Sequence, residues 1–272
     1  MSEAFIRAVD LKLARAKAHI VALNASIDKW KSENPATPKV EFLDGRLGYR
    51  VRIDYSADAP VEEWGLIIGD FVHNLRSALD NLAFGLARLH CDPPTRPRVI
   101  AFPIFLKEAE FRGKAGPALD QMPAQAARLI ETIQPFKRDG SPMSGVPDSD
   151  GLVFLNMLSN ADKHQVPSVV LMAPTGVEFD GQVEFYSEEH ARLNTPPDTT
   201  FFGDPIARGS ILLEHRAKNP ISKVKGSFRV PLAISLRTPR GILRLEQTLP
   251  GLESYANLVV DQFRPLFSTT HA

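Results

Sequence analysis

Apolar residues recur at alternating spacings of three and four in two long segments of the chain, a pattern typical of a helix packed lengthwise against another helix. The first segment covers residues 3–33, between Ser2, a suitable N-cap, and Pro35, which ends a helix. The second segment follows Pro60. Because a compact stretch joins the two, the sequence predicts an antiparallel helix pair inside a bundle. The two apolar seams consist of Ile6, Val9, Leu13, Ala16, Ile20, Leu23, Ile27 and Trp30, and of Trp64, Ile68, Phe71, Leu75, Ala78, Leu82 and Leu89.

The same seams leave a second arrangement open, in which an extended coiled coil joins two subunits. The second helix carries further apolar residues outside its seam, more than a two-stranded coil can bury. These residues favour the bundle, although seams of this length also favour a homodimer. They are Ile67, Val72, Leu79 and Leu86.

Alternation of apolar and polar residues predicts strands in the rest of the chain. Residues 39–55 have the pattern of a β-hairpin that turns at Asp44-Gly45. Beyond residue 166, β-like segments cover residues 169–172, 177–186, 211–215, 228–236 and 242–249. Shorter helices are predicted over residues 124–133 and 152–164. An amphipathic helix over residues 252–267 is predicted to face inward with Tyr255, Leu258, Val259, Phe263, Leu266 and Phe267.

The order of these elements predicts an α+β fold. We expect a helical bundle with an inserted β-hairpin, packed on a C-terminal antiparallel sheet and a final helix. Composition divides the chain into a helical bundle over residues 1–165, with the hairpin near 39–56, and a β-rich region with the C-terminal helix over residues 166–272. One continuous domain is the alternative.

Composition and charge narrow the class of protein. The chain has 272 residues, of which 43% are hydrophobic and 24% charged, as in soluble globular proteins. It carries 32 basic and 32 acidic side chains, so no net field attracts nucleic acid or an anionic membrane. Cys91 is the single cysteine, which excludes a disulfide framework and multi-cysteine zinc motifs. The N-terminus lacks the apolar core of a signal peptide, and no apolar run approaches the roughly 18 residues of a membrane span. We therefore expect a cytoplasmic protein with no membrane partner.

The second long helix carries a polar face of unusual composition. His73, Arg76, Ser77 and Asp80 gather opposite the apolar seam, where solvated helices usually carry Lys, Glu and Gln. Arg76 and Asp80 lie four residues apart, a spacing that suits an ion pair. Asp70, three residues before His73, could hold the imidazole in one tautomer or raise its pKa. Such a face indicates contact with fixed partners rather than with water.

A second polar group lies at the end of the helix over residues 152–164. Asn160 and His164 are four residues apart and share a stripe of that helix. Lys163 lies near the helix C-terminus, where the dipole favours a cation. Capping of the helix end explains the two basic residues, Lys163 and His164. It leaves Asn160 and Asp162, which are poor helix formers, unexplained.

Together the two polar segments allow three interpretations. Two histidines with nearby cations suffice for acid–base cleavage of a phosphodiester: one removes the proton of the attacking hydroxyl, and the other protonates the leaving oxygen. A polar latch that ties the helix to the hairpin or to the last helix is the structural interpretation. A metal held by His73, Asp80 and His164 is less favoured, because no metal-specific spacing occurs. No cofactor or metal is predicted, and glycine-rich phosphate loops are absent. The candidate catalytic residues are His73, Arg76, Asp80, Asn160, Lys163 and His164.

The two segments resemble those of a family of uncharacterised bacterial proteins. Its members share a GD-x-x-HNLRSALD helix, here residues 69–80, and an N-x-DKH helix end, here residues 160–164. They also share a Phe-Pro-Ile segment, here residues 102–104, and an Ile-Gln-Pro segment, here residues 133–135. The resemblance covers residues 60–166 and implies a shared fold without an established activity.

A more distant similarity is to HEPN-type ribonucleases, which are small helical bundles of toxin–antitoxin and abortive-infection systems. Their motif places Arg and a polar residue ahead of three residues and a His. Here Asn160 and His164 match that motif, and Ser159 replaces the Arg. Arg76, from the other helix, could substitute for it in space. The similarity implies metal-independent cleavage of RNA.

These observations favour a binding or interaction module with a polar His/Arg/Asp pocket on a helical bundle. An HEPN-like ribonuclease of a toxin or phage-defence system is the alternative. The partner is a small molecule, RNA or a protein, and the sequence does not distinguish these.

Overall fold

The computed structural model of the chain describes residues 2–141, 145–164, 170–174, 176–202, 207–238 and 240–268. Side chains within these ranges are described except at 2–3, 162–164 and 170–174. The fold is α+β, as the sequence predicts. The chain divides into two compact units. The helical unit comprises Met1–Asn24, Glu62–Ser168 and Gln247–Ala272, and the β unit comprises Ala25–Val61 and Val169–Glu246.

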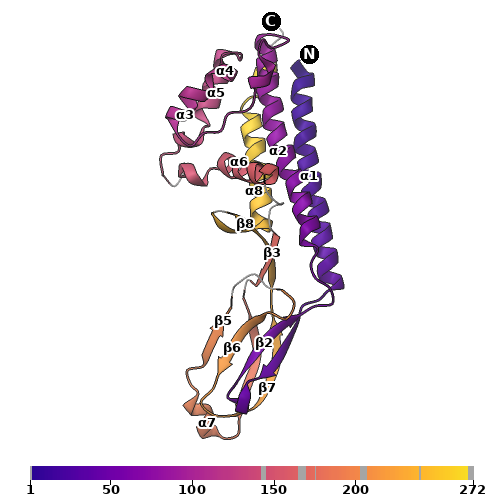
Figure 1. Ribbon diagram of the computed structural model, residues 1–272, viewed down its shortest axis with the longest axis vertical. Helices are drawn as coiled ribbons and strands as arrows, with labels where there is room; N and C mark the ends of the chain where they lie inside the picture. Colours follow the sequence, from indigo (N-terminus) through magenta and orange to yellow (C-terminus); the bar gives the residue numbers. More distant parts are fainter. Residues whose placement is uncertain are drawn as a thin grey trace. The chain divides into compact units, whose positions relative to one another are not determined.

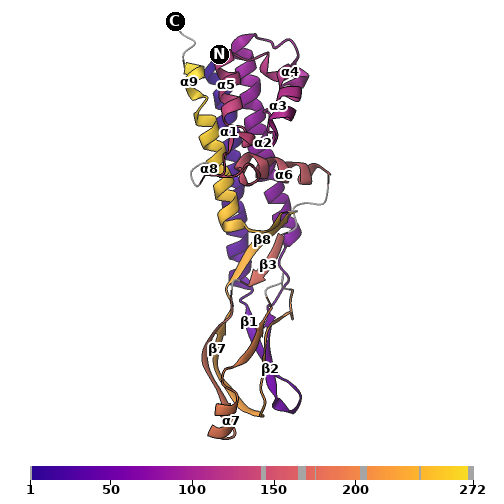
Figure 2. The same cartoon turned by 90° about the vertical axis from the view of Figure 1, so that its left-hand side faces the viewer.

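Three long helices, each mostly within the helical unit, run side by side there: α1 (Ser2–Glu33), α2 (Val61–His90) and α8 (Leu245–Asp261) (Figures 1 and 2). Both predicted seams are confirmed, because Val9 and Leu23 of α1 and Ile68 and Leu75 of α2 are almost fully buried. Shorter helices complete the unit: α3 (Glu108–Lys114), α4 (Gly116–Leu119), α5 (Ala124–Thr132), α6 (Gly151–His164) and α9 (Arg264–Ser268).

The final helix differs from its prediction. Helix α8 begins at Leu245, so the strand predicted over residues 242–249 ends early, and the break before α9 divides the predicted helix. Buried residues continue at spacings of three and four through Pro250, so packing of the seam outweighs that residue's helix-breaking tendency. These residues are Leu245, Leu249, Leu252, Ala256, Val260 and Phe263. Leu258, predicted to face inward, is 62% exposed.

Antiparallel strands form the β unit. A four-stranded sheet has the order β1-β2-β6-β5, formed by β1 (Thr37–Phe42), β2 (Gly48–Asp54), β6 (Ile211–Arg216) and β5 (Asp198–Phe201). A second sheet pairs β4 (Glu178–Phe185) with β7 (Ile221–Arg229). A third has the order β3-β8-β9, formed by β3 (Val170–Pro174), β8 (Leu232–Thr238) and β9 (Gly241–Arg244).

The structure assigns the hairpin and the last helix to different units from those in the predicted division of the chain. Strand β2 pairs with β6, with Val51 opposite Leu213, so the hairpin belongs with the C-terminal strands. Conversely, most of α8 belongs to the helical unit. The strand predicted over residues 228–236 is two strands, because Val230-Pro231 separates β7 from β8. Strand β5 and the short helices α3, α4 and α7 (Glu188–Leu193) were not predicted.

Three aromatic rings from β2, β6 and β7 pack together in the β unit. Tyr49 stacks on His215 with ring centroids 5.0 Å apart, and the Phe228 ring lies 6.3 Å from Tyr49. Burial lowers the pKa of His215, whose Nδ1 lies 2.9 Å from the Thr199 hydroxyl. Gly48 precedes this cluster with a φ of 146°, and a Cβ there would lie 2.2 Å from the His215 carbonyl oxygen. Only glycine therefore permits this close pairing of β2 and β6.

No helix in the described ranges of the chain has both the length and the hydropathy needed to cross a membrane.

Candidate functional site

The polar face of α2 holds the segment that contains Phe102. Arg76 Nη2 donates to Asp80 Oδ1 over 2.9 Å and to the Phe102 carbonyl over 2.7 Å. The Phe102 N–H in turn donates to Asp80 Oδ1 over 2.9 Å. The ion pair predicted from the spacing of Arg76 and Asp80 is therefore confirmed. The two side chains thus bind both the N–H and the carbonyl of Phe102. The Phe102 ring is buried and contacts Phe263.

Gln134 extends this arrangement. Its side chain is fully buried, and its Nε2 donates to the carbonyls of Pro103 and Ile130 over 2.9 and 3.1 Å. Its Oε1 accepts the Phe105 N–H over 3.0 Å. Arg76, Asp80 and Gln134 together fix the backbone from Phe102 to Phe105, and we call these three residues the clamp. The clamp joins the HNLRSALD, Phe-Pro-Ile and Ile-Gln-Pro segments.

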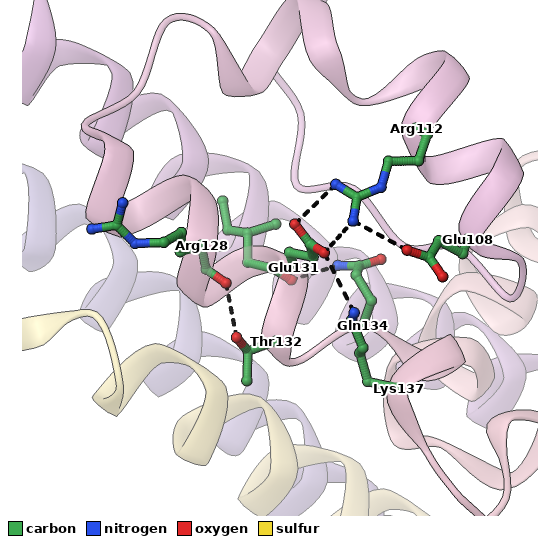
Figure 3. A network of polar contacts seen from close by, with 8 residues as sticks. Glu108, Arg112, Arg128, Glu131, Thr132, Gln134 and Lys137 are labelled. Atoms are coloured by element: carbon green, nitrogen blue, oxygen red, sulfur yellow. Dashed lines mark hydrogen bonds and ion pairs between the residues drawn. The ribbon is translucent and has the colours of Figure 1, made fainter.

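An ion-pair cluster lies beside Gln134 at the surface (Figure 3). Arg112 Nη2 lies 2.6 Å from a Glu131 oxygen and 3.1 Å from a Glu108 oxygen. Lys137 Nζ lies 3.4 Å from the same Glu131 oxygen. The Arg112 guanidinium holds the pKa of Glu131 below its ordinary value. The cluster ties α3 to α5 and to the turn after it, so it has a structural role.

His73 differs from the rest of the face because it is exposed. Its Nε2 lies 3.4 Å from the Ser77 hydroxyl. The support expected from Asp70 is not seen: Asp70 is itself exposed, and its carbonyl accepts Asn74 Nδ2 over 2.7 Å. Lys12 Nζ reaches Asn74 Oδ1 over 3.4 Å. Arg76 and Asp80 of the clamp therefore have different surroundings from His73, although all three lie on α2.

The second predicted segment is only partly described. Asn160, in the last turns of α6, is exposed, whereas Ser159 beside it is buried. The side chains of Asp162, Lys163 and His164 lie outside the described residues. The meeting of this helix end with His73 therefore stays a prediction. Among the described residues, no three His, Cys, Asp or Glu side chains gather as a metal site would require.

A second polar centre was not predicted from the sequence. Asp150 accepts three hydrogen bonds: from Arg138 Nε over 2.6 Å, from the Tyr255 hydroxyl over 2.9 Å and from the Leu152 N–H over 2.8 Å. Arg138 Nη2 also donates to the Tyr255 oxygen over 2.5 Å. Gly151 allows the approach of Tyr255, because a Cβ there would lie 2.6 Å from its ring. The available signal was Asp150 directly before a helix, where aspartate is a favoured N-cap.

This centre predicts a pH dependence. Burial, and then the charge of Asp150, raise the pKa of Tyr255 to about 12 from an ordinary value of 10.0. The folded state therefore keeps its phenol protonated where the unfolded chain ionises it. The resulting stabilisation is complete below pH 10 and is lost as the pH rises towards 12.

Phenolate absorbance, followed as the pH rises, tests this expectation. Subtracting the titration of Tyr255→Phe from that of the wild type should leave a single step at about pH 12. A step near pH 10 while the chain remains folded would contradict the burial of this phenol.

Cavities occur in both units. In the helical unit, a cavity of about 660 Å³ lies beside the second polar centre and is lined by Ile133, Arg138, Tyr255 and Leu258, among others. In the β unit, one of about 580 Å³ is lined by three carboxylates and two guanidinium groups, together with apolar residues. The charged residues there are Glu41, Asp44, Arg50, Glu214 and Arg216.

Basic residues of β7 do not form an unpaired patch. Lys225 lies 2.6 Å from Glu184 on β4, and Arg229 lies 3.7 Å from Glu178. The Lys225 ammonium keeps the pKa of Glu184 below its ordinary value. This face is therefore neutralised across the strands.

Comparison of the chain with models of protein families, with curated proteins and with solved structures found no match.

Proposed function

We propose that the chain is a binding or interaction module and that the motif on α2 has a structural role beneath a contact surface. The observation that carries this proposal is the clamp. Arg76 is 14% exposed, and its Nη2 contacts Asp80 and the Phe102 carbonyl. An arginine that stabilises a phosphoryl transition state has to direct its donors at the substrate. The Nη2 group of Arg76 instead contacts Asp80 and the Phe102 carbonyl, and its buried Nη1 meets no hydrogen-bond partner among the described residues.

The proposed contact surface is a stripe of α2 beside Arg76 and Asp80, exposed at Leu66, Asp70 and His73 and half-buried at Ser77. Leu66, Asp70, His73 and Ser77 follow one another at spacings of four, three and four residues, so they share one helix face. Leu66 is 61% exposed, although it is large and apolar. Asp70, His73 and Ser77 have short or planar side chains, which lose little conformational entropy when a partner orders them. These properties support a surface that binds a partner.

Crosslinking tests this proposal with a matched control. A photoreactive residue at position 73 should give a discrete crosslinked species in cells, because it lies in the stripe. The same residue at position 21 of α1, where Val21 is 62% exposed, should give none. Equal crosslinking at the two positions, or none at position 73, would contradict the proposed surface.

Incubation with single-stranded RNA in chelator tests the ribonuclease alternative. We expect no cleavage above that of a protein-free control. Because His73 is exposed, His73→Ala should also change the free energy of unfolding by less than about 0.5 kcal/mol. Cleavage that disappears in folded His73→Ala and His164→Ala chains would refute the proposal in favour of the enzyme.

A further inference from the structure

Strand β1 forms one edge of the four-stranded sheet. Its neighbour in the described residues is β2, and the two strands pair from Thr37 opposite Asp54 to Phe42 opposite Tyr49. Figure 2 shows β1 and β2 together as the purple hairpin of the β unit. The apolar seams that favoured a homodimer are buried within the chain, so a contact between copies has to use another surface.

Backbone contacts show which groups of β1 point away from β2. The Leu43 N–H donates to the Gly48 carbonyl over 3.0 Å, whereas the Ile53 carbonyl accepts the Gly209 N–H, on the other side of β2. Bonded pairs alternate along an antiparallel ladder, so even-numbered residues of β2 bond to odd-numbered residues of β1. The N–H and C=O groups of Val40 and Phe42 therefore point to the free edge.

The side chains at this edge are incompletely covered. Val40 and Phe42 are each 39% exposed, although they lie opposite the buried Val51 and Tyr49. Edge strands are commonly protected by proline and lysine. Pro38 lacks an N–H and protects one end, and Lys39 lies between Pro38 and Val40 in sequence. Within the described part of the chain, the outward N–H and C=O groups of Val40 have no strand beside them.

We propose that β1 pairs with β1 of a second copy of the chain, antiparallel and centred on Val40. Because outward groups belong to even-numbered residues, three central registers can form hydrogen bonds across the edge. If the two-fold axis passes through Lys39, that residue lies opposite the partner's Lys39. If the axis passes through Glu41, that residue lies opposite the partner's Glu41. Only centring on Val40 places Lys39 opposite the partner's Glu41. Like charges in direct cross-strand pairs are destabilising, so charge selects this register.

This register forms hydrogen bonds on both sides of the two-fold axis, and of the outward groups only the Phe42 carbonyl, opposite the proline, gains no donor. Each Val40 N–H donates to the carbonyl of the partner's Val40, and each Phe42 N–H donates to the carbonyl of the partner's Pro38. The charges then form an alternating row. Arg52 lies 2.8 Å from Glu41, and Lys39 pairs with Asp54, so each pair that spans the interface continues an ion pair already present within a chain. The contact is one short strand, so we expect a weak dimer with a Kd in the micromolar range.

Sedimentation of the full chain over a range of concentrations tests this pairing. The wild type should associate reversibly to a dimer at micromolar concentrations. Lys39→Glu and Glu41→Lys each replace two attractive pairs by two repulsive ones, and each should weaken the dimer at least about tenfold. The double variant Lys39→Glu/Glu41→Lys should recover it, because complementarity is restored in this register alone.

A mixture of the two single variants supplies the control for folding. The Lys39→Glu and Glu41→Lys chains should form a mixed dimer at concentrations where each is monomeric alone. The substituted side chains Lys39 and Glu41 are 60% and 50% exposed, so both variants should keep the wild-type circular dichroism spectrum. A wild type that stays monomeric, or a dimer unaffected by either single substitution, would overturn the proposal.

Discussion

Replacement of Asp150 by alanine should lower the free energy of unfolding by about 4 kcal/mol. This value lies within the range of about 3 to 5 kcal/mol found when one partner of a buried ion pair is removed. The Asp150 side chain is 1% exposed and accepts from Arg138, Tyr255 and the Leu152 N–H. Without it, the Arg138 guanidinium would remain largely buried beside a phenol alone. Helix α6 would also lose the carboxylate at its N-terminus. Urea unfolding measures the loss.

Asp120→Ala is the matched control, because Asp120 is exposed at the end of α4. It should change stability by less than about 0.5 kcal/mol. The loss of stability in Asp150→Asn should lie between those of Asp150→Ala and Asp120→Ala, since an amide oxygen can still accept the Leu152 N–H. A loss below about 1 kcal/mol for Asp150→Ala would show that this centre does not support the fold.

The second large effect is expected at the clamp. Asp80→Ala should destabilise the chain by about 2 to 3 kcal/mol, because it removes the acceptor of the Phe102 N–H and leaves the Arg76 charge without its carboxylate. The cost is smaller than at Asp150, since Asp80 is 37% exposed and solvent screens the ion pair. Urea unfolding again measures the loss.

Asp70→Ala provides the control on the same helix. Asp70 is exposed, and its hydrogen bond to Asn74 uses the backbone carbonyl, which the substitution keeps. We expect Asp70→Ala to change the free energy of unfolding by less than about 0.5 kcal/mol. Equal losses for Asp70→Ala and Asp80→Ala would mean that the clamp contributes nothing particular to stability.

Local spacing predicted those features whose partners lie on the same element. The seams of α1 and α2 and the Arg76–Asp80 pair follow from helical periodicity, which reaches one or two turns along the chain. The contact of that pair with Phe102 joins residues 22 apart on different elements. No spacing rule connects an ion pair to the backbone of another segment. The sequence therefore predicted a polar latch between α2 and the hairpin or the last helix, and not the contact with the Phe102 backbone.

Long-range pairing explains most of the remaining differences. The hairpin was placed with the helices because it lies between them in sequence, yet β2 finds its second neighbour in β6. Pro250-Gly251 marked a boundary by its local chemistry, whereas burial of Leu249 and Leu252 continues the helix across it. Leu258 fits the apolar pattern of α8 but is exposed beside a cavity. Such outcomes depend on which surfaces meet, and sequence periodicity does not contain that information.

Amide hydrogen exchange at Phe102 tests the central claim most directly, because that N–H donates to Asp80 Oδ1. If the polar face of α2 is a structural clamp, Asp80→Ala should lower protection of the Phe102 amide by about tenfold or more. The Phe105 amide, held by Gln134, should change less, and Asp70→Ala should leave both amides unchanged. Equal protection of Phe102 in the wild type and in Asp80→Ala would contradict the clamp.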